Sequence, residues 1–292
     1  INTYACGSEL NGSSELEGIG TMCHEFSHCL GLPDFYDTSY TYMGMDAWDV
    51  MDTGCYNGDG YQPAGYTAYE RWFCGWLEPI LLTEPVTVSD MPAIQNEPVA
   101  YVLMQSGTKA NINSTYYLMY NHQMVGWDEA SYGHGMLVQY VRYNRTAWDN
   151  NTVNNGATQR MTIIPADGDF NKNNFSALAG DPWPGRTKNT TFTWNKHTVS
   201  GITEHSGLIR FLFDGGTPMS PLPTPVVDAD AVRTTTATFT AVWEAVEEAT
   251  AYNLQYRVLD EGDDPEAVVQ DPNLTWSLVR NITNTTYTVQ RS

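Results

Sequence analysis

The 292-residue sequence predicts an α+β fold class, in which a helical segment is followed by antiparallel, β-sandwich-like domains. Three observations carry this prediction. Apolar residues recur at helical spacing in residues 17–32, short alternating runs typical of strands occupy residues 80–216, and a proline-rich stretch separates the last part of the chain from them. We therefore divide the chain into residues 1–79, residues 80–216, a stiff linker at 217–225, and residues 226–292.

The first helix is predicted over residues 17–32, where the apolar positions are Ile19, Met22, Cys23, Phe26 and Leu30. Gly31 followed by Pro33 is a signal that ends a helix. Residues 34–65 consist mostly of turn residues, and a second helix is predicted over residues 64–75.

The middle of the chain alternates in the manner of strands, with runs at residues 86–88, 101–104, 116–120 and 137–141. Clusters of turn residues separate these runs, which predicts an antiparallel β domain.

The last part of the chain also alternates, in residues 236–243 and 251–258. A tryptophan on a strand, Trp243, together with paired tyrosines favours a β-sandwich core. This segment resembles the first strands of a fibronectin type III domain, and residues 226–292 are predicted to form part of such a domain.

Composition restricts the partners. The chain carries 14 basic and 34 acidic residues, and its formal charge of −20 repels phosphate backbones, so we expect no nucleic acid partner. No apolar run approaches the ~20 residues of a membrane span. The chain begins at Ile1 rather than at an initiator methionine, so we expect that it is processed or cut. Most of its five cysteines are predicted to be buried, and the sequence allows one disulfide.

Residues 24–34 carry the spacing of a zinc site. His24 and His28 are four residues apart, so on a helix they share one face and can bind one cation together. Asp34 follows within reach as a third ligand, and Gly31 lets the backbone turn towards it. Glu25, beside the first ligand, is the candidate general base.

Two acidic stretches raise the question of structural calcium. Residues 167–174 alternate oxygen ligands, but they lack the glycine and the final glutamate of an EF-hand, so a polar turn is the favoured interpretation. A second group lies downstream of the histidines and consists of Asp46, Asp49, Asp52 and Asp59. Asp37 is an alternative candidate for orienting a histidine.

A methionine in a turn-like setting supports the zinc interpretation. Metzincin peptidases pair their zinc motif with a downstream Met-turn, and Met51 is the candidate for that residue. The chain here resembles the immune inhibitor A family of bacterial metallopeptidases (family M6), in the strings HEFSHCLGLPDFYDT, WDVMDTG, GYTAYERWFCGWL, YYLMYNHQMVGWDE and HGMLVQYV.

The resemblance implies that His24, His28 and Asp34 bind zinc, that Glu25 is the base and that Met51 is the Met-turn residue. It also implies a protein of the bacterial exterior, secreted or at the cell surface, and allows structural calcium. Only 23 residues precede His24, whereas a metzincin builds the upper wall of its cleft from the chain before the motif. We therefore expect that this fragment binds zinc without being a competent protease.

The expected function is a secreted zinc-dependent endopeptidase that hydrolyses peptide bonds in extracellular proteins. Two alternatives stay open. One is an extracellular binding or adhesion protein that recognises a glycan or a protein surface and has a vestigial or structural zinc site. The other is a zinc hydrolase that acts on something other than peptides.

Overall fold

The computed structural model describes residues 6–10, 12, 15–42, 44–170, 176–216, 225–228, 232–235, 238–246, 249, 252–256 and 277–290. The chain divides into two compact units, Ile1–Thr217 and Pro218–Ser292. Apart from Pro225, the predicted proline-rich linker lies outside the described residues. The further division of the first unit at residue 79 stays a prediction.

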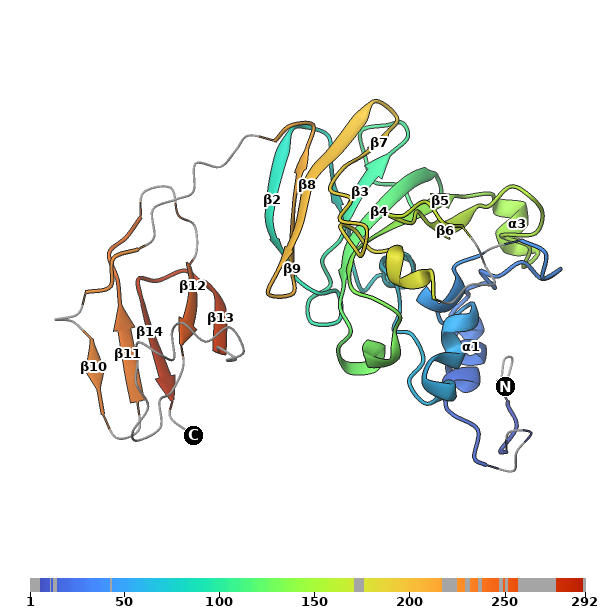
Figure 1. Ribbon diagram of the computed structural model, residues 1–292, viewed down its shortest axis with the longest axis horizontal. Helices are drawn as coiled ribbons and strands as arrows, with labels where there is room; N and C mark the ends of the chain where they lie inside the picture. The colour runs from blue at the N-terminus through green and yellow to red at the C-terminus, as the bar shows by residue number, and fades with distance from the viewer. Residues whose placement is uncertain are drawn as a thin grey trace. The chain divides into compact units, whose positions relative to one another are not determined.

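The first unit contains helices and sheets, which confirms the α+β class (Figure 1). Its α-helices are α1 (Gly20–Cys29), α2 (Ala68–Phe73) and α3 (Arg145–Asp149). In the described part of this unit, short 3-10 helices accompany them: η1 (Asp46–Trp48), η2 (Thr53–Gly60), η3 (Gly126–Ala130) and η4 (Leu178–Gly180).

Both predicted helices are shorter than expected, and the packing of their ends explains why. The start of α1 lies directly against η2, since a Cβ atom added to Gly20 would be 1.7 Å from the carbonyl oxygen of Cys55. Its other end is set by Gly31, whose φ of 98° continues the chain in the left-handed region. Thr67 begins α2, where its backbone N–H donates to Glu70 Oε2 at 2.6 Å.

Two sheets build the rest of this unit. The central sheet has the order β1-β3-β4-β5-β6, with bounds Ile80–Leu81, Tyr101–Met104, Thr115–His122, Gly135–Arg142 and Met161–Ile163 in chain order. The outer sheet has the order β2-β9-β8-β7, with bounds Val86–Met91, Leu208–Phe213, His197–His205 and Phe192–Trp194 in that order. All these pairings are antiparallel except β1 with β3, which is parallel and was not predicted.

The central sheet is buried on both faces, because alternate side chains of one strand enter two different cores. On β4, Tyr116, Leu118 and Tyr120 pack against the segment that contains the helices and their connecting turns. Met119 packs on the opposite face against the outer sheet. In Figure 1 the sheet of β2, β8 and β9 accordingly lies on one side of the central strands and α1 lies on the other. The helical segment is thereby held on a rigid support.

The apolar residues of α1 do not form a buried face, since Met22 is 50% and Phe26 55% exposed. The prediction that most of the cysteines are buried was wrong. Among the five cysteines, all within the described residues, only Cys55 is buried, and all five thiols are free. The serine at position 27, rather than these apolar residues, anchors α1: it is fully buried, and its hydroxyl lies 2.7 Å from the hydroxyl of Tyr66.

The second unit has two small sheets. One has the order β10-β11-β14 (Arg233–Thr234, Thr238–Val242, Thr286–Gln290), and the other pairs β12 (Tyr252–Tyr256) with β13 (Ser277–Ile282). Trp243 is buried in the core that they share, with its ring 5.5 Å from that of Tyr252. Residues 236–237 of the first predicted strand and residues 251 and 257–258 of the second lie outside the described residues. The likeness to a fibronectin type III domain stays a prediction.

None of the helices in the described part of the chain has the length and apolar character that crossing a lipid bilayer requires.

A buried tryptophan links η1 to the segment after η4. The indole Nε1 of Trp48 donates to Asp181 Oδ2 at 2.7 Å, and both side chains are buried. Burial, reinforced by the negative charges of Asp167 and Asp46 and only partly offset by the hydrogen bond from Trp48, raises the pKa of Asp181 to about 7.

This shift predicts a pH dependence of stability. The pKa of Asp181 is 3.8 in the unfolded chain and about 7 in the folded chain, so between these two pH values the folded chain retains a proton that the unfolded chain has lost. Its contribution to stability is therefore complete below pH 3.8 and is lost as the pH rises to about 7, with a slope of at most about 1.4 kcal/mol per pH unit. Asp181→Asn keeps an acceptor for Trp48 and should flatten this fall, measured by urea unfolding across the pH range.

The matched control is Asp149→Asn, because Asp149 has an exposed side chain that pairs only with Arg145 at the surface. Its stability should follow the wild-type pH profile. An Asp181→Asn profile as steep as the wild type would contradict the assignment.

Candidate metal centre

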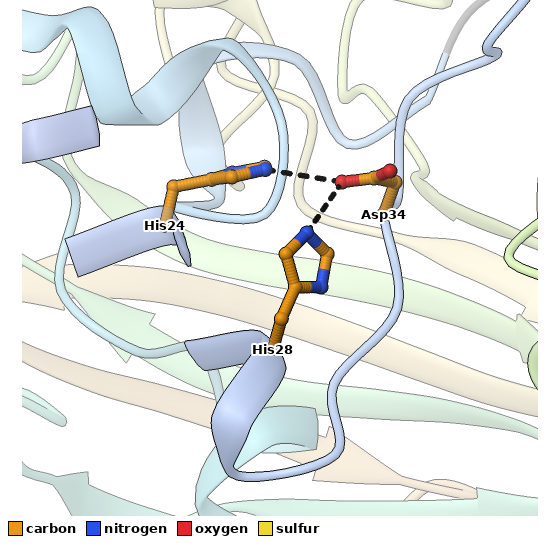
Figure 2. Close-up of side chains that lie close together, drawn as sticks. All are labelled: His24, His28 and Asp34. Carbon is orange, nitrogen blue, oxygen red and sulfur yellow. Dashed lines mark ion pairs between the residues drawn. The ribbon is translucent and has the colours of Figure 1, made fainter. Parts of the chain in front are cut away.

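Helix α1 and the turn after it bring three potential metal ligands together. His24 and His28 lie one helical turn apart on α1, and Asp34 follows after the chain has reversed at Gly31. Figure 2 shows both imidazole rings pointing towards the Asp34 carboxylate. His24 Nε2 lies 3.0 Å and His28 Nε2 3.2 Å from Asp34 Oδ1. Among the described residues, this is the one group of histidine, cysteine and acidic side chains in which at least three ligand atoms lie within 4.8 Å of one another.

Backbone carbonyls determine which ring nitrogens face the centre. His24 Nδ1 lies 2.8 Å from the carbonyl oxygen of Val50, and His28 Nδ1 lies 2.7 Å from that of Leu32. A carbonyl oxygen can only accept, so each Nδ1 must carry the proton and donate it. In the neutral rings, both Nε2 lone pairs are thereby aimed at the carboxylate.

The centre consequently requires positive charge. With neutral histidines, Asp34 Oδ1 is a buried oxygen that faces two lone pairs and has no donor. Burial alone would lower the pKa of His24, but the hydrogen bonds with Asp34 and Val50 outweigh this effect, so the pKa of His24 is raised. Asp34 likewise raises the pKa of His28. The pKa of Asp34 is lowered well below its usual range, since the two histidines and Asn151 outweigh the effect of its burial.

These residues fit a metal ion. Two imidazole nitrogens and one carboxylate oxygen are a ligand set that zinc accepts, and a cation at their meeting point would satisfy the orphaned oxygen of Asp34. His24 and Asp34 have side chains that are 12% and 7% exposed, whereas that of His28 is 31% exposed. The centre is thus largely buried and is most accessible past His28.

Glu25 and His24 border the same cavity, which has a volume of about 470 Å³. Tyr36, Tyr40 and Asp46 also line it. The structure therefore places the candidate base beside the first histidine at an open space, where a further molecule has room to bind.

Met51 is fully buried in the turn that supports His24. Its backbone N–H donates to Asp49 Oδ1 at 2.8 Å, and its carbonyl accepts from Phe35 N at 2.9 Å. The turn thus connects Val50, which holds His24, with the residue directly after Asp34. The role of Met51 as a floor beneath a metal ion stays a prediction.

A second acidic residue stabilises this turn from α2. Asp49 and Glu70 are both fully buried, and neither Asp49 Oδ2 nor Glu70 Oε1 has a hydrogen-bond partner among the described residues. Burial raises the pKa of Asp49 to about 6, and burial with the adjacent charge of Asp49 raises that of Glu70 well above its usual value. A single proton held by Glu70 would account for both shifts, and it would let Glu70 donate to Asp49.

The predicted candidates for calcium and for histidine orientation have other partners. Asp37 accepts hydrogen bonds from Ser39, Thr41 and Tyr42, so it holds its own turn rather than a histidine. Asp52 accepts from the backbone of Met45, Asp46 and Thr53. The predicted loop at 167–174 lies partly outside the described residues, and a calcium site stays a prediction.

One contact of the centre was missed at the sequence level. Asn151, which lies just after α3, contacts Asp34 through both atoms of its amide. The only sequence signal is a local excess of asparagine at residues 150–155, a composition that turns commonly have.

The shared proton leads to a prediction for α2. Glu70→Gln keeps an acceptor for Thr67 and a donor for Asp49, so its free energy of unfolding should stay within about 1 kcal/mol of the wild type. Glu70→Ala leaves buried polar groups unpaired and creates a cavity, which should cost roughly 3 kcal/mol. Urea denaturation at pH 7 measures both. Equal losses in the two variants would contradict a protonated Glu70.

Comparisons with known proteins concern the segment that carries the centre. Residues 11–76 match the family model described as immune inhibitor A peptidase M6, catalytic domain. The Pre-pro-metalloprotease PrtV of Vibrio cholerae serotype O1 (strain M66-2) is 40% identical over 58 residues, which are 18% of this chain and 6% of that protein. Immune inhibitor A of Bacillus thuringiensis subsp. alesti is 41% identical over 59 residues, which are 19% of this chain and 9% of that protein.

The matched segment is thus a small part of each relative, and it points to a metalloprotease. It contains His24, Glu25, His28, Asp34 and Met51. The resemblance of this chain to the immune inhibitor A peptidases is therefore confirmed over residues 11–76.

Proposed function

We propose that this chain carries the zinc centre of a secreted, metzincin-type endopeptidase that hydrolyses peptide bonds in extracellular proteins. The observation that carries the proposal is the convergence of two Nε2 lone pairs and one carboxylate oxygen on a single point, with both Nδ1 atoms held by backbone carbonyls. The peptidase family match over the same residues supports it.

In this proposal His24, His28 and Asp34 hold the ion. A structural zinc site is normally closed by four protein ligands, and the group found among the described residues has three, which favours a catalytic site with an open position. The bound ion supplies Lewis acidity, which makes water more acidic and polarises the carbonyl group of a peptide bond. Met51, in the turn that supports His24, is proposed as the Met-turn residue.

Glu25 is the proposed general base. Glu25 borders the cavity beside His24, and we propose that an attacking water binds there next to the substrate. The carboxylate accepts a proton from the water as the water oxygen adds to the carbonyl carbon of the peptide bond. It then delivers that proton to the nitrogen of the leaving amine.

The proposed location is the exterior of a bacterium. The name of one relative describes a pre-pro form, which is in keeping with an exported precursor. The acidic composition suits contact with proteins or peptides better than contact with nucleic acid.

The test combines metal content with hydrolysis. Mass spectrometry of the purified chain should find about one zinc ion per molecule, and His28→Ala should lose it. Glu25→Gln should retain zinc, because Glu25 is not a ligand, and in the full-length parent protein it should reduce the hydrolysis of fluorescent casein by about 10²–10⁴-fold.

The outcomes separate the alternatives. Full hydrolysis by Glu25→Gln would overturn the role of Glu25. A full-length parent protein that binds zinc and hydrolyses no peptide would favour the binding or adhesion protein, and a chain that binds no zinc would overturn the metal centre itself.

A further inference from the structure

We propose that Asn151 is a positioning residue of the metal centre, which turns the Asp34 carboxylate so that one oxygen faces the histidines. This inference rests on the proposed function, because it assumes that the His24, His28 and Asp34 group binds zinc. Asn151 lies far outside the segment that matches the peptidase family, which ends at residue 76.

The amide of Asn151 holds both the backbone and the side chain of Asp34. Its Nδ2 donates to Asp34 Oδ2 at 2.5 Å, and its Oδ1 accepts from the backbone N–H of Asp34 at 2.6 Å. Since Oδ2 is occupied in this way, Oδ1 is the oxygen left to face the two Nε2 atoms. The amide thereby fixes Oδ2 in a hydrogen bond and leaves Oδ1 available to a metal ion.

This division matters for a metal ligand. A carboxylate on a freely rotating side chain can present either oxygen or both, and fixing its orientation before the ion arrives reduces the entropy lost on binding. A donor on the second oxygen also disperses part of its negative charge. Asn151 can provide both effects, because a neutral amide offers a donor and an acceptor side by side.

The support for Asn151 is rigid. It follows α3, whose Trp148 is buried and donates from its indole Nε1 to the hydroxyl of Tyr69 on α2 at 2.7 Å. At the start of α3, Asn144 Oδ1 accepts from Ala147 N. The amide is consequently anchored in the same core that holds the turn of Asp49 and Met51.

Two further asparagines hold the residues that follow Asp34. Asn154 is fully buried and donates to the carbonyl oxygen of Phe35 at 2.6 Å. Asn155 accepts from the backbone N–H of Thr38 at 2.9 Å and donates to its hydroxyl. These contacts anchor the loop. Of the three asparagines, Asn151 is the one that contacts the Asp34 carboxylate, and this difference provides a matched control.

Two substitutions separate orientation from anchoring. Asn151→Asp keeps an acceptor for the backbone N–H of Asp34 but replaces the donor with an oxygen that repels Oδ2. Asn151→Gly removes the amide and tolerates the local backbone, because φ of Asn151 is 56°. Asn155→Asp is the control, since it keeps the bond from Thr38 N and can accept from the Thr38 hydroxyl.

The experiment measures the zinc dissociation constant of the full chain by competition with a chromophoric chelator. Loss of a residue that orients a metal ligand typically weakens affinity by about 10–100-fold, and we expect this loss for Asn151→Asp and Asn151→Gly. Asn155→Asp should stay within about twofold of the wild type. Absorption spectra of the cobalt-substituted proteins report the ligand geometry, and only the two Asn151 variants should alter them.

The outcomes distinguish this inference from the proposed function. If the wild type binds neither zinc nor cobalt, the proposed function fails. If the wild type binds zinc and the folded Asn151 variants keep its affinity and its cobalt spectrum, the role of Asn151 is overturned while the metal centre stands. Equal losses in Asn151→Asp and Asn155→Asp would also overturn it, because they would indicate loop anchoring alone.

Discussion

The centre depends on two hydrogen bonds from histidine rings to the backbone. Val50 and Leu32 each offer a carbonyl oxygen to an Nδ1 atom, and this choice of tautomer aims both Nε2 lone pairs at Asp34. In the other tautomer of either ring, the Nδ1 lone pair would face a carbonyl oxygen, and the Nε2 atom would carry a proton and could not act as a ligand. The position of the two carbonyls is therefore as important as the spacing of the histidines, and the buried core maintains that position. Asp49 holds the turn of Val50, and Gly31 allows the reversal that places Leu32.

The central sheet explains how one small motif can depend on so much of the chain. Strand β4 contributes Tyr116 and Leu118 to the core beneath the helical segment and Met119 to the core beneath the outer sheet. A disturbance on either face is thus transmitted to the same strand. The loop after α3, which reaches Asp34, is attached to this arrangement through Trp148.

Local features were predictable from the sequence, and features that depend on distant residues were not. Helical spacing placed His24 and His28 on one helix, the glycine at position 31 indicated its end, and a run such as Tyr101–Met104 was recognised as a strand. Asp34 could be found from its offset after the motif. The carbonyls of Val50 and Leu32 have no sequence signature, because every residue has one. Asn151 is joined to Asp34 only by the tertiary fold, and the exposure of Met22 and Phe26 likewise could not be predicted from their spacing.

The contact between Asp34 and Asn151 spans 117 positions of the chain, and this distance has a consequence for the order of folding. The two histidines can assume their relative placement as soon as α1 forms, since helix formation is local and fast. The third ligand acquires its orientation only after a long loop has closed, which is slow and entropically costly. During synthesis, residue 151 must therefore leave the ribosome before Asp34 has its final contacts, and in the proposed metal centre the complete ligand set would form only in a largely folded chain.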